Sequence, residues 1–136
     1  MPKYTGGDIL EIVCKHPTLG EFRFQAKSNE SFNVDPGGIR SNDDANSISG
    51  GGEMIDQMNR VRPSIEGPIA VDNSSGNELE NLPKLAASPE LGTWTISVID
   101  GTIWKGKGKP VGDIVTDTNT AQMTLKVGCS GKLEKL

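Results

Sequence analysis

The side chains best suited to catalysis or metal binding are one histidine, His16, and two cysteines, Cys14 and Cys129. His16 precedes Pro17 in a predicted turn, where an imidazole lacks the burial and fixed orientation that a Ser-His-Asp triad needs. Cys14 and His16 share one face of a predicted strand, but zinc prefers four ligands and only Cys129 is left to add one. The sequence therefore predicts a strand cysteine and a surface histidine, with no catalytic, cofactor or metal site.

Two glycine-rich segments do not fit a nucleotide-binding loop. Gly50-Gly51-Gly52 lacks a following Lys-Ser/Thr. Residues 106–110, which are expected to join two strands, contain two glycines, and the third glycine that a dinucleotide fingerprint needs is out of register. Lys105, Lys107 and Lys109 alternate, so they project from one side of an extended segment. No aromatic side chain is interleaved with them, which favours an edge guard or a salt bridge to another subunit over nucleic-acid contact.

The chain length of 136 residues suits a single domain spanning residues 1–136. Hydrophobic residues make up 34% of the chain and aromatic residues 4%, so large core side chains are few. Either neighbouring subunits supply part of the stability, or the protein is a monomer with long loops. The net charge of −4 is mild, and it argues against a nucleic-acid binder that grips phosphates. Residues 1–101 carry −7 and residues 102–136 carry +3, which suits head-to-tail contact between copies or local protection of strand edges.

The amino terminus has no apolar signal segment, and no stretch approaches the roughly 18 apolar residues that cross a membrane. We expect a protein made in a cytosol and kept soluble there. In that reducing compartment Cys14 and Cys129 are expected to be buried free thiols, and pairing is the alternative if the product later meets an oxidising medium.

Alternating apolar and polar residues predict strands, and clusters of Pro and Gly predict the turns between them. Expected strands cover residues 8–15, 21–27, 31–35, 63–71, 93–99, 102–106, 111–116 and 121–127. The first two form a hairpin, and the last four form an antiparallel meander with a turn at Asp100-Gly101. One helix is expected at 77–87, capped by Asn77 and bent at Pro83, and residues 36–52 are expected to be a long polar loop. The predicted fold is mainly β, an antiparallel β-sandwich or partial barrel with one helix.

The order of these elements is specific. The long loop is entered through residues 35–38 (Asp-Pro-Gly-Gly), and a segment with residues 63–66 (Pro-Ser-Ile-Glu) and then one helix follow it. The final meander has Trp104 in its second strand and ends in the run 121–128. This order resembles the tail tube proteins of contractile-tailed bacteriophages, including the Mu-like kind, over nearly the whole chain.

The resemblance implies a structural protein without enzyme activity or cofactor. Such proteins form hexameric rings in which inner strands from all subunits join into one barrel, and the rings stack into a tube that passes genomic DNA without binding it specifically. The implied partners are further copies, the tail sheath, tape measure, baseplate and tail terminator proteins, and no membrane. The implied location is the virion tail, assembled in the host cytoplasm. The type VI secretion tube shares this fold, so a type VI-like or extracellular contractile injection system is one alternative, and a monomeric β-sandwich binding module is another.

Within that resemblance, the loop at 36–52 would become ordered on a neighbouring ring or subunit. Its expected contact residues are Asp35, Pro36, Gly37, Gly38, Ile39, Arg40, Asp43, Asp44 and Ile48. Lys105, Lys107 and Lys109 are candidates for further subunit contacts. Cys14 and Cys129, at the end of the first strand and just past the last, are candidates for a disulfide between subunits, with buried free thiols as the favoured alternative.

Overall fold

The structure, a computed structural model, describes residues 4–42, 46–72 and 78–136, with the backbone alone at residues 78 and 79. The helix α1 is Glu78–Ala87. The strands are β1 (Ile9–His16), β2 (Gly20–Phe24), β3 (Asn33–Asp35), β4 (Gly38–Ser41), β5 (Ser47–Ile48), β6 (Met54–Ile55), β7 (Met58–Val61), β8 (Ser64–Ala70), β9 (Gly92–Val98), β10 (Ile103–Pro110), β11 (Thr116–Asp117) and β12 (Gln122–Lys135). The prediction of a mainly β, antiparallel fold with one helix is confirmed.

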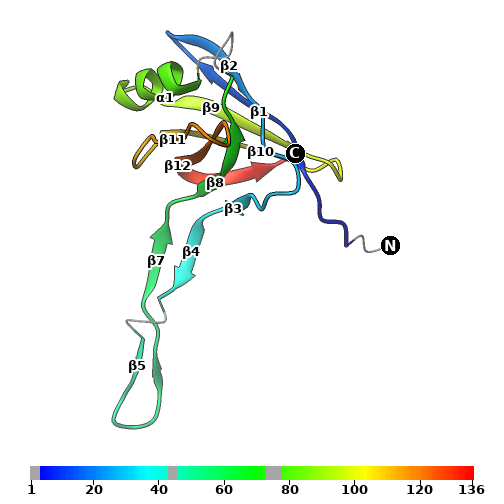
Figure 1. The fold of residues 1–136 in the computed structure, drawn as a ribbon. Helices are drawn as coiled ribbons and strands as arrows, with labels where there is room; N and C mark the ends of the chain where they lie inside the picture. Colours follow the sequence, from blue (N-terminus) through cyan, green and yellow to red (C-terminus); the bar gives the residue numbers. More distant parts are fainter. Residues whose placement is uncertain (1–3, 43–45, 73–77) are drawn as a thin grey trace.

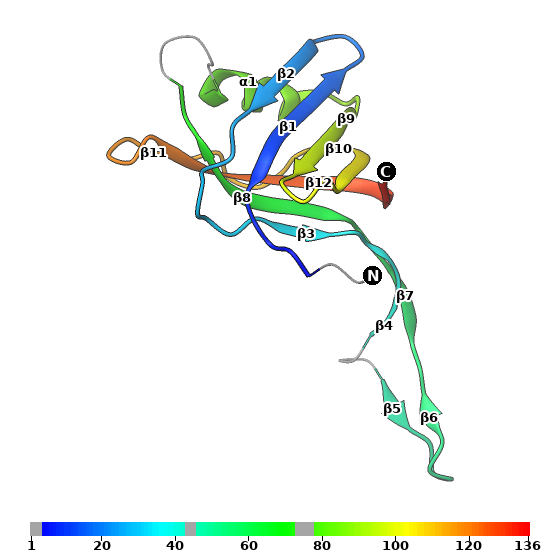
Figure 2. The ribbon, with the colours of Figure 1, turned by 90° about the vertical axis from the view of Figure 1, so that its right-hand side faces the viewer.

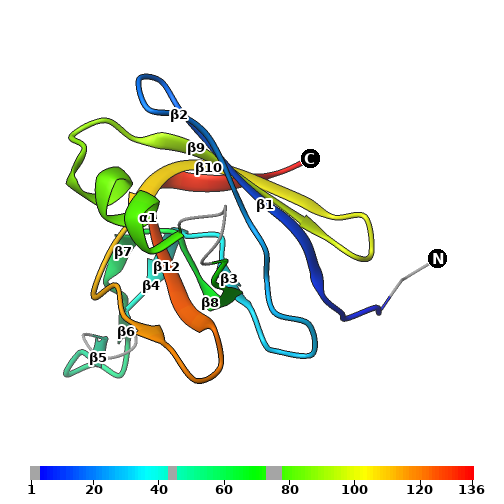
Figure 3. The same cartoon turned by 45° about the horizontal axis from the view of Figure 1, so that its top comes forward.

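One large sheet forms the body, in the order β2-β1-β9-β10-β12-β8-β3, with β11 paired to β12. After β2 the chain crosses to β8, near the opposite edge of the sheet. There the Lys27 N–H donates to the Pro68 carbonyl (3.2 Å) and the Ala70 N–H donates to the Gln25 carbonyl (2.8 Å). Pro68 has no N–H to donate, and it lies beside this interrupted pairing, as expected for a proline in a strand. The sheet is therefore strongly curled without closing into a barrel (Figure 3).

The core lies on the inner face of the curled sheet. The alternation in β9 and β12 places one face of each strand inside, as predicted. The buried residues of this face are Trp94, Ile96, Met123, Leu125 and Val127. The ring of Phe24 stacks on Trp94 with centroids 5.7 Å apart, and the indole N–H donates to the Gly108 carbonyl at 3.0 Å. The largest buried side chain thus has its one polar group satisfied.

Helix α1 packs beside β10 at one end of the curled sheet (Figure 3). Leu82 and Leu85 point into the core and are each 1% exposed, whereas Pro83 faces solvent. Each of these two leucines contributes about 1.5–3 kcal/mol through burial. The predicted cap, Asn77, lies outside the described residues.

The carboxy-terminal strands differ from the prediction. Residues 106–110 are part of the strand β10 and not a connection between strands. The strand expected at 111–116 is reduced to the short β11, because Gly112 has a φ of +78° and ends the extended chain. β10 therefore pairs directly with β12. Ala121 was expected on the inner face, but it is exposed at a φ of +50° and precedes β12.

The segment expected as a loop at 36–52 is mostly the first half of a β-ribbon. β4 pairs with β7 and β5 with β6, so residues 38–61 form a long two-stranded arm that leaves the body (Figures 1 and 2). Neither face of this ribbon lies against the large sheet. Its sequence therefore needs no alternation of apolar and polar residues, and the pattern that reveals strands elsewhere is missing.

Candidate functional site

The arm, defined as residues 38–61, carries exposed apolar side chains along its length. They are Ile39, Ile48, Met54, Ile55 and Met58, with exposed fractions between 49% and 70%. A two-stranded hairpin is marginally stable in water unless a further surface covers it. The arm thus combines a weak element with a row of apolar groups that the body does not cover, which is typical of an interaction surface.

The arm is also the acidic part of the protein. Its outer part, residues 41–59, which we call the distal arm, holds four acidic residues and no Lys or Arg. Two of these acids, Glu53 and Asp56, are exposed, while Asp43 and Asp44 lie outside the described residues. The other 14 acids of the chain are balanced by its 14 Lys and Arg residues, so the distal arm accounts for the whole net charge of −4.

An ion pair between Arg40 and Asp35 lies at the base of the arm. The Arg40 guanidinium donates to both oxygens of Asp35, one of them at 3.0 Å, and the Gly37 N–H donates to the same carboxylate at 2.9 Å. These hydrogen bonds, led by that from Arg40, lower the pKa of Asp35 below its ordinary value. This ion pair links the end of β3 to β4, where β4 leaves the body.

Both strands of the arm are anchored on β12. The Leu133 N–H donates to the Pro36 carbonyl (3.0 Å), and the Cys129 N–H donates to the Pro63 carbonyl (2.9 Å). Backbone pairing of Gly37 with Lys132 adds a third link. The arm is therefore a continuation of the sheet at its base and a free ribbon beyond it.

A pocketed, basic surface lies beside this base. Lys107 pairs with Ser130 and Lys105 with Glu134, so Gly106 alone faces residues 131–133, and this bulge opens a pocket of about 250 Å³. A second, largely apolar pocket of about 250 Å³ adjoins it and shares Lys132. We call both pockets together the root groove. It is lined by Gly38, Ile39, Arg60, Val61, Gly131 and Lys132 on one side, and by Lys105, Gly106, Lys107, Ser130 and Glu134 on the other.

The three lysines predicted to act together are divided between two environments. Lys105 and Lys107 are exposed in the root groove, where their amines contact no hydrogen-bonding or ionic partner among the described residues. Lys109 instead donates to the Ser88 carbonyl at 3.3 Å. Lys132 joins the first two in the groove, and sequence reasoning missed it because the bulge in β12 has no alternating pattern.

His16 is buried, so the prediction of a surface histidine is wrong. Its Nδ1 accepts the backbone N–H groups of Thr18 (3.2 Å) and Leu19 (3.1 Å), which assigns the ring proton to Nε2. Nε2 then donates to Ser88 Oγ at 3.0 Å. A general base needs a free lone pair toward the serine, and this tautomer presents a proton instead. The bond is a structural link between the first hairpin and the end of α1.

Cys14 and Cys129 are both buried free thiols within the chain, the favoured expectation. Burial raises the pKa of Cys14 to about 12, and burial, partly opposed by Arg62, raises that of Cys129 to about 11. The thiolate is the reactive form, so both residues are chemically inert at neutral pH. A disulfide between subunits stays a prediction, and it would require one edge of the core to open first.

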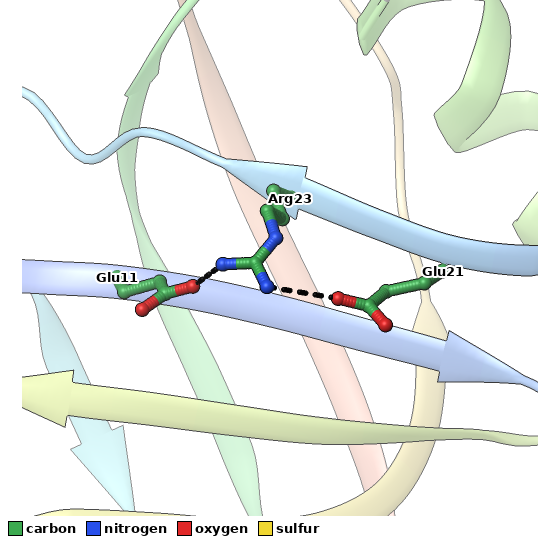
Figure 4. Close-up of polar contacts among 3 residues, drawn as sticks. All are labelled: Glu11, Glu21 and Arg23. Carbon is green, nitrogen blue, oxygen red and sulfur yellow. Dashed lines mark hydrogen bonds and ion pairs between the residues drawn. The ribbon is translucent and has the colours of Figure 1, made fainter.

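The acids of the first hairpin, in contrast with those of the distal arm, have a cation beside them. Arg23 on β2 lies between Glu11 and Glu21, donating to Glu21 at 3.0 Å and also to Glu11 (Figure 4). These exposed pairs stabilise the fold by only about 0.2–1 kcal/mol. They do neutralise the acids locally, so this hairpin presents no unbalanced negative surface.

Within the described ranges, no helix is long and apolar enough to cross a membrane, and no three His, Cys, Asp or Glu side chains are grouped to hold a metal ion. No protein-family model matches the chain, and no curated protein matches it significantly. The arm and the root groove are therefore the candidate functional surfaces of the part of the chain that the structure describes.

Proposed function

We propose that the protein is a structural subunit that assembles with further copies of itself through the arm, in a tube of the kind implied by its resemblance to phage tail tube proteins. The observation that carries this proposal is the arm: a projecting ribbon with exposed apolar side chains that no other described part of the chain covers. Hollow rings stacked into a conduit for DNA are the assembly that the resemblance implies.

The arm gains much from a partner. Full burial contributes about 1.5–3 kcal/mol for each large apolar side chain, so covering the five exposed ones would supply several kcal/mol. Ordering the ribbon costs backbone entropy, and most of this cost is already met within one chain by the β4–β7 and β5–β6 pairing and by the anchoring of the base on β12.

The partner must be another molecule. The arm spans 24 residues, and its tip is the turn between β5 and β6. It leads away from the body in both side views, so its tip cannot fold back onto its own sheet without breaking the ribbon (Figures 1 and 2). A contact between an arm and a different surface of an identical copy is heterologous, and such contacts build rings and open stacks.

The test is the assembly state of the full chain and of an armless variant. Ser41 and Met58 are register partners, so replacing residues 42–57 by Asn-Gly joins them through a two-residue hairpin turn. Sedimentation velocity and electron microscopy report assembly, and fluorescence of the buried Trp94 reports an intact body. We expect rings or tubes from the full chain and folded monomers from the armless variant.

Three results would contradict the proposal in whole or in part. A full chain that stays monomeric at high concentration would favour the alternative of a monomeric binding module. An armless variant that still assembles, with unchanged Trp94 fluorescence, would place the contact elsewhere. If the copies assemble without forming hollow rings, the proposal of self-assembly stands and the proposal of a tube is overturned.

A further inference from the structure

The distal arm and the root groove are complementary in both charge and polarity. The distal arm has a charge of −4 with no base, and acids flank its apolar side chains in the run Glu53-Met54-Ile55-Asp56. The root groove has an apolar wall formed by Ile39 and Val61. Its other residues include three lysines without partners among the described residues.

The two surfaces cannot meet within one chain. The groove lies at the base of the arm, whereas Glu53 lies in the turn between β5 and β6 at the far end and Asp56 lies between β6 and β7. The ribbon leads away from the body (Figure 2). The groove of one copy is therefore free to receive the arm of a second copy. The receiving copy's own arm then points onward, so the contact repeats in one direction.

We infer that the distal arm of one copy docks in the root groove of the next. Glu53 and Asp56 face Lys105 and Lys132, and the apolar side chains at the tip cover the apolar wall. This inference rests on the proposed self-assembly and names the surface that receives the arm. A second copy fits better than a nucleic acid, because half of the groove is apolar and because the distal arm supplies the missing negative charge within the same chain.

Charge reversal tests the pairing in both directions. One variant carries E53K/D56K in the arm and the other carries K105E/K132E in the groove. Each should raise the concentration needed for assembly by about tenfold or more, because like charges then meet in a partly buried contact. The chain with all four changes restores opposite charges in every contact and should assemble within about threefold of the original protein.

Matched controls separate this pairing from net charge. E30K/E90K and K84E/K126E change the same numbers of exposed charges away from both surfaces, and they should assemble like the original chain. Circular dichroism and thermal unfolding verify that each variant is folded.

The outcomes are distinct. Loss of assembly in both double variants with recovery in the fourfold variant supports the docking site. If the original chain assembles but the reversals have no effect, or have an effect without recovery, the docking site is overturned while the proposed function stands. An original chain that never assembles overturns both. A groove that binds a fluorescent DNA duplex, with K105E/K132E losing the duplex but not assembly, would also overturn the inference.

Discussion

The imidazole of His16 bonds to Ser88, 72 positions further along the chain, and this bond sets how the end of α1 sits against the first hairpin. Pro17 correctly marks a turn after the histidine. The burial of the ring could not be predicted, because it depends on where the helix packs. A residue beside a proline turn is usually exposed. Here the ring can be buried because both of its nitrogens are hydrogen-bonded, one to the distant Ser88 hydroxyl and the other to two local N–H groups.

Replacing His16 by Asn should lower the free energy of unfolding by about 1–3 kcal/mol. The amide oxygen can still accept the N–H groups of Thr18 and Leu19, but the shorter side chain cannot reach Ser88. Ser88→Ala should cost about 1 kcal/mol on its own and clearly less in the Asn background, where the bond to His16 is already lost and only the hydrogen bond from the exposed Glu90 N–H to Ser88 Oγ (3.2 Å) is removed. Urea unfolding followed by tryptophan fluorescence measures both, and additive losses would show that the two residues do not act through one bond.

Raising the pH above about 9 should destabilise the protein through its two buried thiols. Burial raises their pKa from the ordinary 9.0 to about 12 for Cys14 and about 11 for Cys129. Below pH 9.0 both states keep the protons and the stabilisation is complete. Above it the unfolded chain releases them first, so the free energy of unfolding falls by up to about 1.4 kcal/mol per pH unit for each thiol, until the pH passes the folded-state pKa.

Urea titrations across this range measure the slope, and Cys14→Ala with Cys129→Ala is the control. The double variant should show a flatter decline, because the two buried thiols are then absent. Equal slopes would contradict buried protonated thiols. Ellman's reagent near neutral pH gives an independent check, since it should label the thiols only after denaturant is added.

Among the elements, β10 was the hardest to predict as a strand beyond its first residues. Gly106 and Gly108 occupy its inner positions because neighbouring side chains fill that space: a Cβ on Gly106 would lie 2.4 Å from Leu133. Inner positions without side chains have no apolar alternation, so residues 106–110 looked like a connection. The strands with apolar inner positions, such as β9, were predicted almost to their ends.

Gly108→Ala should destabilise the protein by about 1–3 kcal/mol. The added Cβ would lie 2.4 Å from the Gly128 carbonyl oxygen and 2.9 Å from the Cys129 sulfur, so backbone would have to move. Gly50→Ala is the matched control at the tip of the arm, where a Cβ meets nothing within 4 Å. It should be neutral or stabilising by up to about 1 kcal/mol. Thermal unfolding compares the two, and equal stability would contradict the close packing of β10 on β12.

For the whole molecule, the uneven distribution of charge was visible in the sequence, but its boundaries were not. Dividing the chain at residue 101 gives an acidic and a basic part, whereas the structure divides it into a balanced body and a distal arm of −4. The difference arises because β4–β7 and β5–β6 pairing defines where the arm begins, and this pairing has no buried face to mark it in the sequence. The segment expected to make contacts at 36–52 lies largely in the arm, while the surface that we infer to receive it depends on a bulge that only the structure reveals.

Assembly through the distal arm and the root groove should weaken as salt is added. The Debye length falls from about 10 Å at 0.1 M ionic strength to about 3 Å at 1 M, so attraction between exposed acids and lysines is screened, while apolar burial is not weakened. The concentration needed for assembly should therefore rise several-fold between about 0.1 M and 1 M sodium chloride, as measured by sedimentation velocity. E53Q/D56N removes two of the charges and keeps the shape, so it should assemble less well at low salt and respond less to salt. Assembly that is insensitive to salt, or that strengthens with it, would mean that apolar contacts alone join the copies and that the charge of the arm serves another purpose.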